Sequence, residues 1–237
     1  MSPVHPRPVS RNVTRHGVGL LNQSGRRVDA HEVELAAGGS ARREAARRTA
    51  SREKRIRERH PRIGGLYLAL SDVPQTTKIW TVGAQAEEKV GRALDALKGT
   101  VVLHDRIVPG RSRANIDHIV ITNSGVVVVD TKRYRGRIDV GRKKLRIDNR
   151  DKTELVAGVQ AQAAAIKAIV SPGVPVDCIL CFVDGRLPFL SRTRCRGTGV
   201  MGVQGLRRHI KKVVRARQSI STTDVALQLA SQLRSAV

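Results

Sequence analysis

The sequence is poor in aromatic residues and cysteines, and each scarcity excludes a class of protein. Only five of its 237 residues are aromatic, which argues against a single-strand binder that interleaves aromatic and basic side chains. The three cysteines, Cys178, Cys181 and Cys195, are too few for a disulfide framework, and we expect Cys178 and Cys181 to be buried thiols on a core strand. Cys178 and Cys181 would point to opposite faces of a strand and are therefore a poor chelating pair.

Long apolar runs and acidic residues are also lacking. No run is long enough to cross a membrane, and the first residues lack the apolar core of a signal peptide, which predicts a cytoplasmic protein without a transmembrane segment. Only 20 Asp and Glu accompany 44 Lys and Arg, so the net charge is +24. This charge favours a polyanionic partner, with nucleic acid ahead of an anionic membrane surface, although a basic surface can also serve solubility alone. The sequence indicates no oligomeric state.

Two strands joined by a tight turn are predicted in the middle of the chain. The runs Ile116–Thr122 and Val126–Lys132 are rich in β-branched residues and are separated by Asn-Ser-Gly. Because alternate side chains of a strand share a face, Asp117 lies at the end of one apolar row, and Asp130 and Lys132 lie at the end of another. A carboxylate in such a position must be paired, hydrated or bound to a metal, since an unpartnered buried charge is costly.

An amphipathic helix is predicted from Gly83 to Leu97, because apolar residues recur there at spacings of three and four. Its stripe consists of Ala86, Val90, Ala93, Leu94 and Leu97. At about 100° per residue, Glu87 borders this stripe whereas Glu88 faces solvent. If one of the two acids belongs to a site, the geometry favours Glu87.

The remaining pattern predicts an α/β (α+β) fold with a mixed β-sheet flanked by helices. Further strands are expected at 100–108, 136–140, 144–147, 174–183 and 198–203, and further helices at 155–170, 204–217 and 222–235. Asp151 is expected to cap the helix at 155–170. We divide the chain into a flexible, disordered arm (1–39), a basic helix with a docking segment (40–80), a main domain (81–190), and a strand with basic helices that complete this domain (191–237).

The basic helix has ten Lys and Arg against three Glu between positions 40 and 62, and almost no apolar stripe. It is either a solvated helix held by Glu–Arg pairs or a phosphate-binding arm, and the density of arginine favours the arm. The candidate nucleic-acid contacts, including basic residues elsewhere, are Arg42, Arg43, Arg47, Arg48, Arg111, Arg113, Arg133 and Arg135.

The central residues suit phosphodiester hydrolysis, which needs a hard divalent cation held by oxygen ligands. The carboxylates of Asp117 and Asp130 and a backbone carbonyl, that of Thr131, leave positions for water and a phosphate oxygen. Lys132 can orient the attacking water and offset negative charge, and Glu87 can add a ligand or tune the water. We expect Mg²⁺, with Mn²⁺ as the alternative, rather than zinc, because no Cys or His lies at chelating spacing.

These segments resemble the NERD (nuclease-related domain) family. The resemblance rests on Gly-Ala-Gln-Ala-Glu-Glu-Lys-Val-Gly around Glu87, Asn-Ile-Asp-His-Ile-Val around Asp117, and Asp-Thr-Lys-Arg-Tyr-Arg-Gly from Asp130, and it covers about 81–189. It implies a restriction-endonuclease-like fold, similar to PD-(D/E)XK nucleases, in which a glutamine of the next helix joins the site. We take Gln162 for this role, with Gln160 as the alternative.

The sequence therefore predicts a magnesium-dependent endo- or exonuclease that acts on nucleic acid, with DNA expected. The alternative is a non-catalytic or weakly catalytic nucleic-acid-binding module that uses the Arg-rich arm. A third interpretation is a protein that binds the membrane surface through the same arm.

Overall fold

The computed structural model describes residues 75–110, 115–188, 193–216 and 220–236, together with 20–21, 27–28, 39, 43–44, 46–47, 49–51, 54 and 58. The helices in these ranges are α3 (Gln75–Asp95), α4 (Glu154–Ile169), α5 (Val203–Val214) and α6 (Thr222–Gln232). The longer strands are β3 (Thr100–Ile107), β4 (Ile116–Thr122), β5 (Gly125–Arg133), β9 (Val176–Val183) and β11 (Thr198–Gly202). The shorter strands are β1 (Leu20–Leu21), β2 (Arg27–Val28), β6 (Ile138–Val140), β7 (Leu145–Ile147), β8 (Arg150–Asp151), β10 (Arg194–Cys195) and β12 (Arg234–Ser235).

Seven strands form one mixed sheet in the order β10-β11-β9-β5-β4-β3-β12. β3, β4 and β5 form an antiparallel meander, whereas β9 runs parallel to β5 and β11 runs parallel to β9. Thr122 pairs with Gly125, so the turn between β4 and β5 is the predicted tight turn, with Asn123 and Ser124 at its tip. Gly125 has a φ of 145°, and a Cβ there would lie 2.7 Å from the carbonyl oxygen of Pro175.

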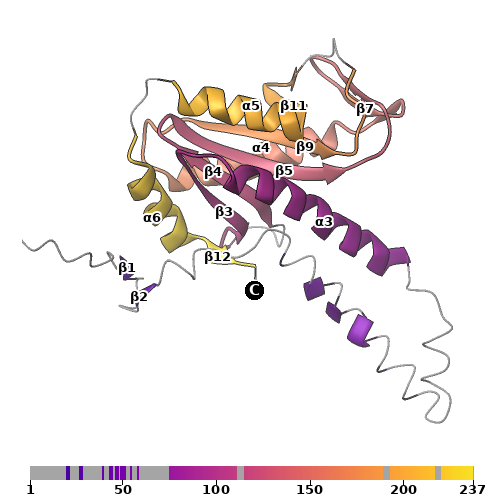
Figure 1. Ribbon diagram of the computed structural model, residues 1–237, viewed down its shortest axis with the longest axis horizontal. Coiled ribbons are helices and arrows are strands. Elements are labelled where there is room, and N and C mark those ends of the chain that lie inside the picture. Colours follow the sequence, from indigo (N-terminus) through magenta and orange to yellow (C-terminus); the bar gives the residue numbers. More distant parts are fainter. Residues whose placement is uncertain are drawn as a thin grey trace, which may run out of the picture.

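Helices cover both faces of this sheet (Figure 1). On one face, α3 and α5 pack on an apolar layer that contains Val127 and Val129 of β5. On the other face, α4 and α6 pack on a layer that contains Val126 and Val128. A central strand covered on both faces needs apolar side chains in both directions, which explains the run of four valines. This mixed α/β architecture is the predicted one and is consistent with a restriction-endonuclease-like fold.

The three cysteines are buried free thiols, as predicted for Cys178 and Cys181. Cys178 and Cys181 belong to opposite apolar layers of the sheet, so their side chains point to opposite faces of β9. Burial raises the pKa of the Cys181 thiol to about 12. The thiol therefore stays protonated and contributes to packing.

Several element boundaries differ from the prediction. α3 begins at Gln75, eight residues before Gly83, inside the stretch assigned to a docking segment. The helix expected at 222–235 ends at Gln232, because Arg234 and Ser235 pair with the edge of β3 as β12. The helix expected at 204–217 begins one residue earlier and ends three residues earlier, as α5 (Val203–Val214).

The β6–β7 hairpin was predicted, but its third strand, β8, was not. Asp151 was expected to cap α4, and this prediction is wrong, because Asp151 lies in β8 and Thr153 occupies the N-cap position. The Asp151 carboxylate instead accepts hydrogen bonds from the Thr153 amide and hydroxyl, at 2.9 and 2.5 Å. Asp favours such a local turn over the cap because its short side chain reaches the amide two residues on.

In the N-terminal region, every described position between 43 and 58 is helical, in agreement with the predicted basic helix. Within the stretch predicted to be a flexible arm, β1 and β2 pair antiparallel. The rest of that arm, except position 39, and the docking segment before Gln75 lie outside the described residues.

Candidate active site

Asp117 and Asp130 lie side by side at one end of the β4–β5 pair. They follow directly after the last ladder pair of these strands, so the register places them opposite each other on the same face. The Asp117 carboxylate accepts a hydrogen bond of 2.7 Å from the Thr131 amide. The Lys132 ammonium lies 2.7 Å from the Asp130 carboxylate. The four residues thus bring two carboxylates, an amide and an ammonium together.

Glu87 approaches this group from α3. Its neighbours Ala86 and Val90 are buried in the layer that covers β5, so the helix is held against the sheet and Glu87 is half-buried at its edge. Glu88 is also partly buried, its carboxylate lies 3.9 Å from Arg92, and its charge adds to the raised pKa of Glu87. The charge of Glu87, in turn, acts on the pKa values of both Asp117 and Lys132.

The electrostatics tie Glu87 to the two aspartates. Burial raises the pKa of Glu87 to about 7, the charges of Asp105 and Asp130 add to this, and Lys132 opposes it. Burial is also the main reason why the pKa of Asp117 lies well above its usual range, with further contributions from Asp130 and Glu87. Without a bound cation, Glu87 and Asp117 hold protons at a pH where ordinary carboxyl groups have lost them.

Lys132 provides the positive charge at the centre of the acids. Burial alone would lower the pKa of Lys132, but the charges of Asp130, Asp117 and Glu87 and the hydrogen bond to Asp130 outweigh this and raise it. Lys132 is therefore a cation at every physiological pH. It can stabilise negative charge, but it cannot accept a proton.

Gln162 and Gln160 of α4 lie in different surroundings. The Gln162 amide nitrogen donates to the Asn115 carbonyl at 3.3 Å, just before β4, and its buried Oε1 has no hydrogen-bond partner among the described residues. The Gln160 side chain donates to the Arg196 carbonyl at 2.8 Å, on the side of the β10–β11 turn. Of the two, Gln162 is the one next to the strand that carries Asp117.

A buried chain of hydrogen bonds connects Thr131 to α3. The Thr131 hydroxyl lies 3.2 Å from Nε2 of His118, and Nδ1 of His118 lies 2.8 Å from Nδ1 of His104. Nε2 of His104 lies 2.9 Å from the carboxylate of Asp95 at the end of α3. Both histidines are buried. The chain links an exposed acid on the helix to the residue whose amide holds Asp117.

Asp105 is a further buried acid near the site that the sequence analysis did not select. It adopts a φ of 53° and its carboxylate accepts a hydrogen bond of 2.9 Å from Asn115. The guanidinium of Arg43 lies 3.6 Å from it and also donates to the Ala236 carbonyl. The signal available in the sequence was an acidic residue near the end of an apolar strand. In the structure, the charge of Asp105 helps to raise the pKa of Glu87.

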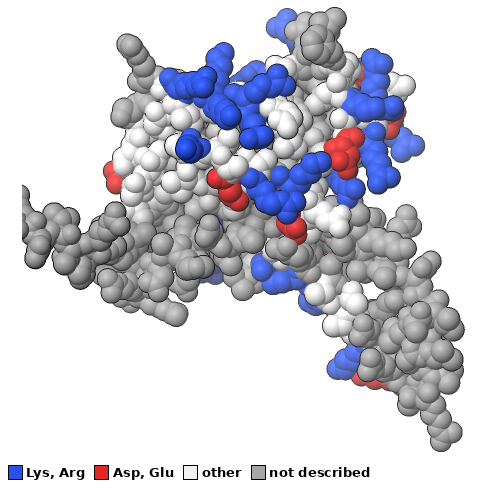
Figure 2. Space-filling view, in the orientation of Figure 1, with Lys and Arg blue, Asp and Glu red and all other residues white. Residues whose placement is uncertain are grey.

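The predicted nucleic-acid contacts are placed only in part. Arg47 pairs with Glu44 at 2.7 Å, as in the solvated-helix interpretation, and Arg133 pairs with Asp184 at 2.8 Å, while Arg135 is exposed. The remaining candidates without a described position are Arg42, Arg48, Arg111 and Arg113. Figure 2 shows Lys and Arg gathered over α5 and around the β6–β8 sheet. The exposed basic residues of these elements include Arg142, Lys143, Lys144, Arg146, Arg150, Arg208, Lys211 and Lys212.

With this geometry established, the comparison with protein families gives one result. Residues 82–183 match the family model of NERD, the nuclease-related domain. The resemblance inferred from the motifs is thereby confirmed, and the NERD segment contains Glu87, Asp117, Asp130, Lys132 and Gln162. It indicates a nuclease-related function. Neither the curated proteins nor the solved structures give a significant match. Among the helices that the structure describes, none is long and apolar enough to span a membrane.

Proposed function

We propose that this protein is a magnesium-dependent nuclease that hydrolyses phosphodiester bonds of DNA. The observation that carries the proposal is the opposed pair of Asp117 and Asp130, with Lys132 at 2.7 Å from Asp130. This group lies in a segment that matches a nuclease-related family. A structural ion pair alone needs one acid and one base, whereas this site gathers several acids around one lysine in a partly buried place.

The donor set suits Mg²⁺ or Mn²⁺, because it consists of oxygen atoms. No three His, Cys, Asp or Glu side chains in the described ranges are close enough to share one ion. We therefore expect Asp117 and Asp130 to hold the ion together with the Thr131 carbonyl and water. The unsatisfied Oε1 of Gln162 supports this, since such an atom can accept from a bound water. A bound Mg²⁺ would polarise the phosphate and acidify a water molecule.

Lys132 and Glu87 have different roles in the proposed hydrolysis. Lys132 stays protonated and offsets the negative charge that grows on the phosphate oxygens as water attacks phosphorus. Glu87, with a pKa of about 7, is suited to accept the proton that this water loses. The bond from phosphorus to the leaving oxygen then breaks, and the leaving oxygen takes a proton from solvent.

A plasmid-nicking assay tests the proposal. Supercoiled DNA is incubated with Mg²⁺, with Mn²⁺ or with EDTA, and the wild type is compared with Asp130→Asn and Lys132→Met. We expect both substitutions to lower the rate on the order of 100-fold or more, as loss of one transition-state contact does. Glu154→Gln is the matched control, because it changes an exposed acid of α4 that pairs with Lys152. Equal rates in all variants, or no cleavage by the wild type, would refute the nuclease proposal.

A nucleic-acid-binding module with a silent site is the second candidate, and the net charge of +24 favours it. The exposed basic residues over α5 and the β6–β8 sheet are suited to phosphate contacts. Binding that weakens steeply with salt, without cleavage under any metal condition, is the result expected for this candidate.

A further inference from the structure

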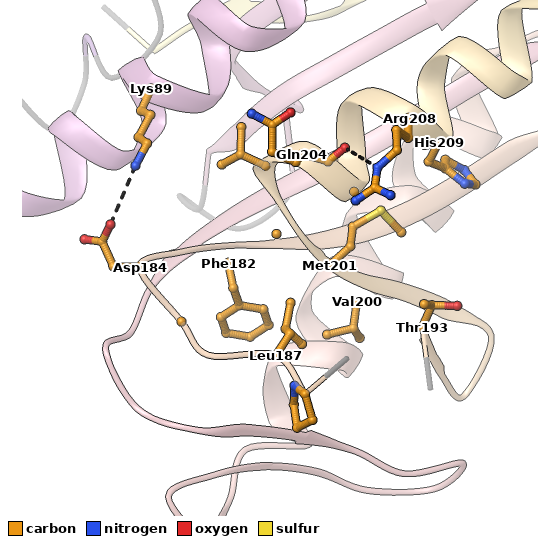
Figure 3. Close-up of a pocket in the computed structure, with 15 residues that line it drawn as sticks. Lys89, Phe182, Asp184, Leu187, Thr193, Val200, Met201, Gln204, Arg208 and His209 are labelled. Atoms are coloured by element: carbon orange, nitrogen blue, oxygen red, sulfur yellow. Dashed lines mark hydrogen bonds and ion pairs between the residues drawn. The ribbon is translucent and has the colours of Figure 1, made fainter. Parts of the chain in front are cut away.

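A cleft of about 840 Å³ lies beside the candidate active site (Figure 3). It is formed where β9 and β11 end, together with the first turns of α5 and with Lys89 of α3. Its walls include Phe182, Leu187, Met201 and Arg208. A cleft of this size holds a ligand as large as one nucleotide.

The cleft adjoins the group around Lys132 through the pairing of two parallel strands. Lys132 of β5 is the direct neighbour of Phe182 of β9, and Phe182 lines the cleft. One residue further along, Arg133 lies 2.8 Å from Asp184, which also contacts Lys89 at 3.7 Å. A strand of nucleic acid whose phosphate is held at Lys132 would therefore extend past this cleft.

One part of the cleft is apolar. Leu187 and Pro188 are partly exposed there, with Phe182 and Val200 buried behind them, whereas Met201 lines the cleft from the opposite face of β11. Such a wall removes apolar surface of a base from water without requiring an exposed aromatic ring, which suits a sequence poor in aromatic residues.

The rim of the cleft is cationic and polar. Lys89 and Arg208 are exposed at it, and Asp184 is its one acidic lining residue within the described ranges. The first turn of α5 also faces the cleft, and its N-cap residue, Gly202, has no side chain to accept from the helix amides. Amides at a helix start and two cations next to an apolar wall match the two halves of a nucleotide, phosphate and base.

We propose that this cleft binds one unpaired nucleotide of the strand that is cut, next to the scissile phosphate. The base lies against Leu187 and Pro188, and its phosphate lies toward Lys89 and Arg208. A base within a duplex is stacked and paired and cannot enter the cleft, so the preferred substrate is single-stranded or locally unpaired nucleic acid. The choice of substrate rests on the nuclease function proposed above, whereas the binding does not.

Binding without cleavage tests this proposal, with the full chain in EDTA. Fluorescence anisotropy compares a short oligothymidine, labelled at its far end, with a blunt duplex and with free thymidine monophosphate. We expect the single strand to bind more tightly than the duplex. Arg208→Glu should weaken single-strand binding about tenfold. Lys212→Glu makes the same charge change one turn later on α5, outside the cleft lining, and should weaken it much less.

Leu187→Asn provides an independent variant, because it removes apolar surface from the cleft without changing charge. It should weaken single-strand binding and leave duplex binding unchanged, and thermal melting of each variant reports whether it is folded. Equal effects of Arg208→Glu and Lys212→Glu, or a duplex bound as tightly as the single strand, would overturn the proposal. If free thymidine monophosphate bound as tightly as the oligonucleotide, the proposal that the cleft binds a nucleotide within a strand would be refuted. Cleavage assays are scored separately, so an inactive wild type would refute the nuclease alone.

Discussion

Nδ1 of His104 and Nδ1 of His118 lie 2.8 Å apart, on paired positions of β3 and β4, and only one of the two atoms carries the shared proton. The carboxylate of Asp95 accepts from Nε2 of His104, so in the neutral imidazole Nδ1 of His104 is the acceptor. His118 must then donate from Nδ1 and accept from the Thr131 hydroxyl at Nε2. Burial, with the neighbouring His104, holds the pKa of His118 well below its usual range, so His118 is neutral and has one donor and one acceptor nitrogen.

The first prediction concerns His118. His118→Phe leaves the Thr131 hydroxyl and Nδ1 of His104 buried without partners, and we expect it to lower the free energy of unfolding by about 2–4 kcal/mol in urea titrations. Asp95→Asn keeps an acceptor oxygen for His104 on a side chain that is 57% exposed, and should cost less than about 1 kcal/mol. Similar losses in the two variants would contradict the directional chain.

The second prediction concerns the pH dependence of Glu87. An unfolded Glu loses its proton near 4.5 and folded Glu87 near 7, so the folded state holds more protons between these values. Rising pH therefore lowers the free energy of unfolding across this window. Glu87→Gln removes this pH dependence. The free energy of unfolding of the variant should equal that of the wild type below pH 4.5 and exceed it above pH 7, by up to about 3 kcal/mol. Urea titrations in EDTA across this range, with the exposed Glu154→Gln as control, measure the difference. A difference independent of pH would contradict the raised pKa.

Much of this site was predictable from local pattern. Alternation along a strand places Asp117 and Asp130 each at the end of an apolar row, and the short turn between β4 and β5 brings those ends together. Helical spacing separates Glu87 from Glu88 in the same way. These inferences succeed because each depends on residues that are close in the sequence.

The parts that were missed depend on pairing between distant segments. β12 replaces the last turn of a predicted helix because Arg234 and Ser235 meet the open edge of β3, which no local periodicity reports. Asp105 belongs to the surroundings of Glu87 only because β3 pairs with β4 and α3 packs above them. The contact between His104 and His118 likewise requires the β3–β4 register.

The third prediction separates two arginines of the basic helix. Arg43 contacts the buried carboxylate of Asp105 and the carbonyl of Ala236, whereas Arg47 pairs with Glu44 on its own helix. Arg43→Ala should therefore lower the free energy of unfolding by about 1 kcal/mol, and Arg47→Ala should leave it within about 0.5 kcal/mol of the wild type. If both arginines instead serve as phosphate contacts, each substitution would reduce the salt dependence of DNA binding by about one ion and leave stability unchanged. Denaturation and salt titrations of the two variants, measured side by side, distinguish a helix anchored to the domain through Arg43 from an arm held on the nucleic acid.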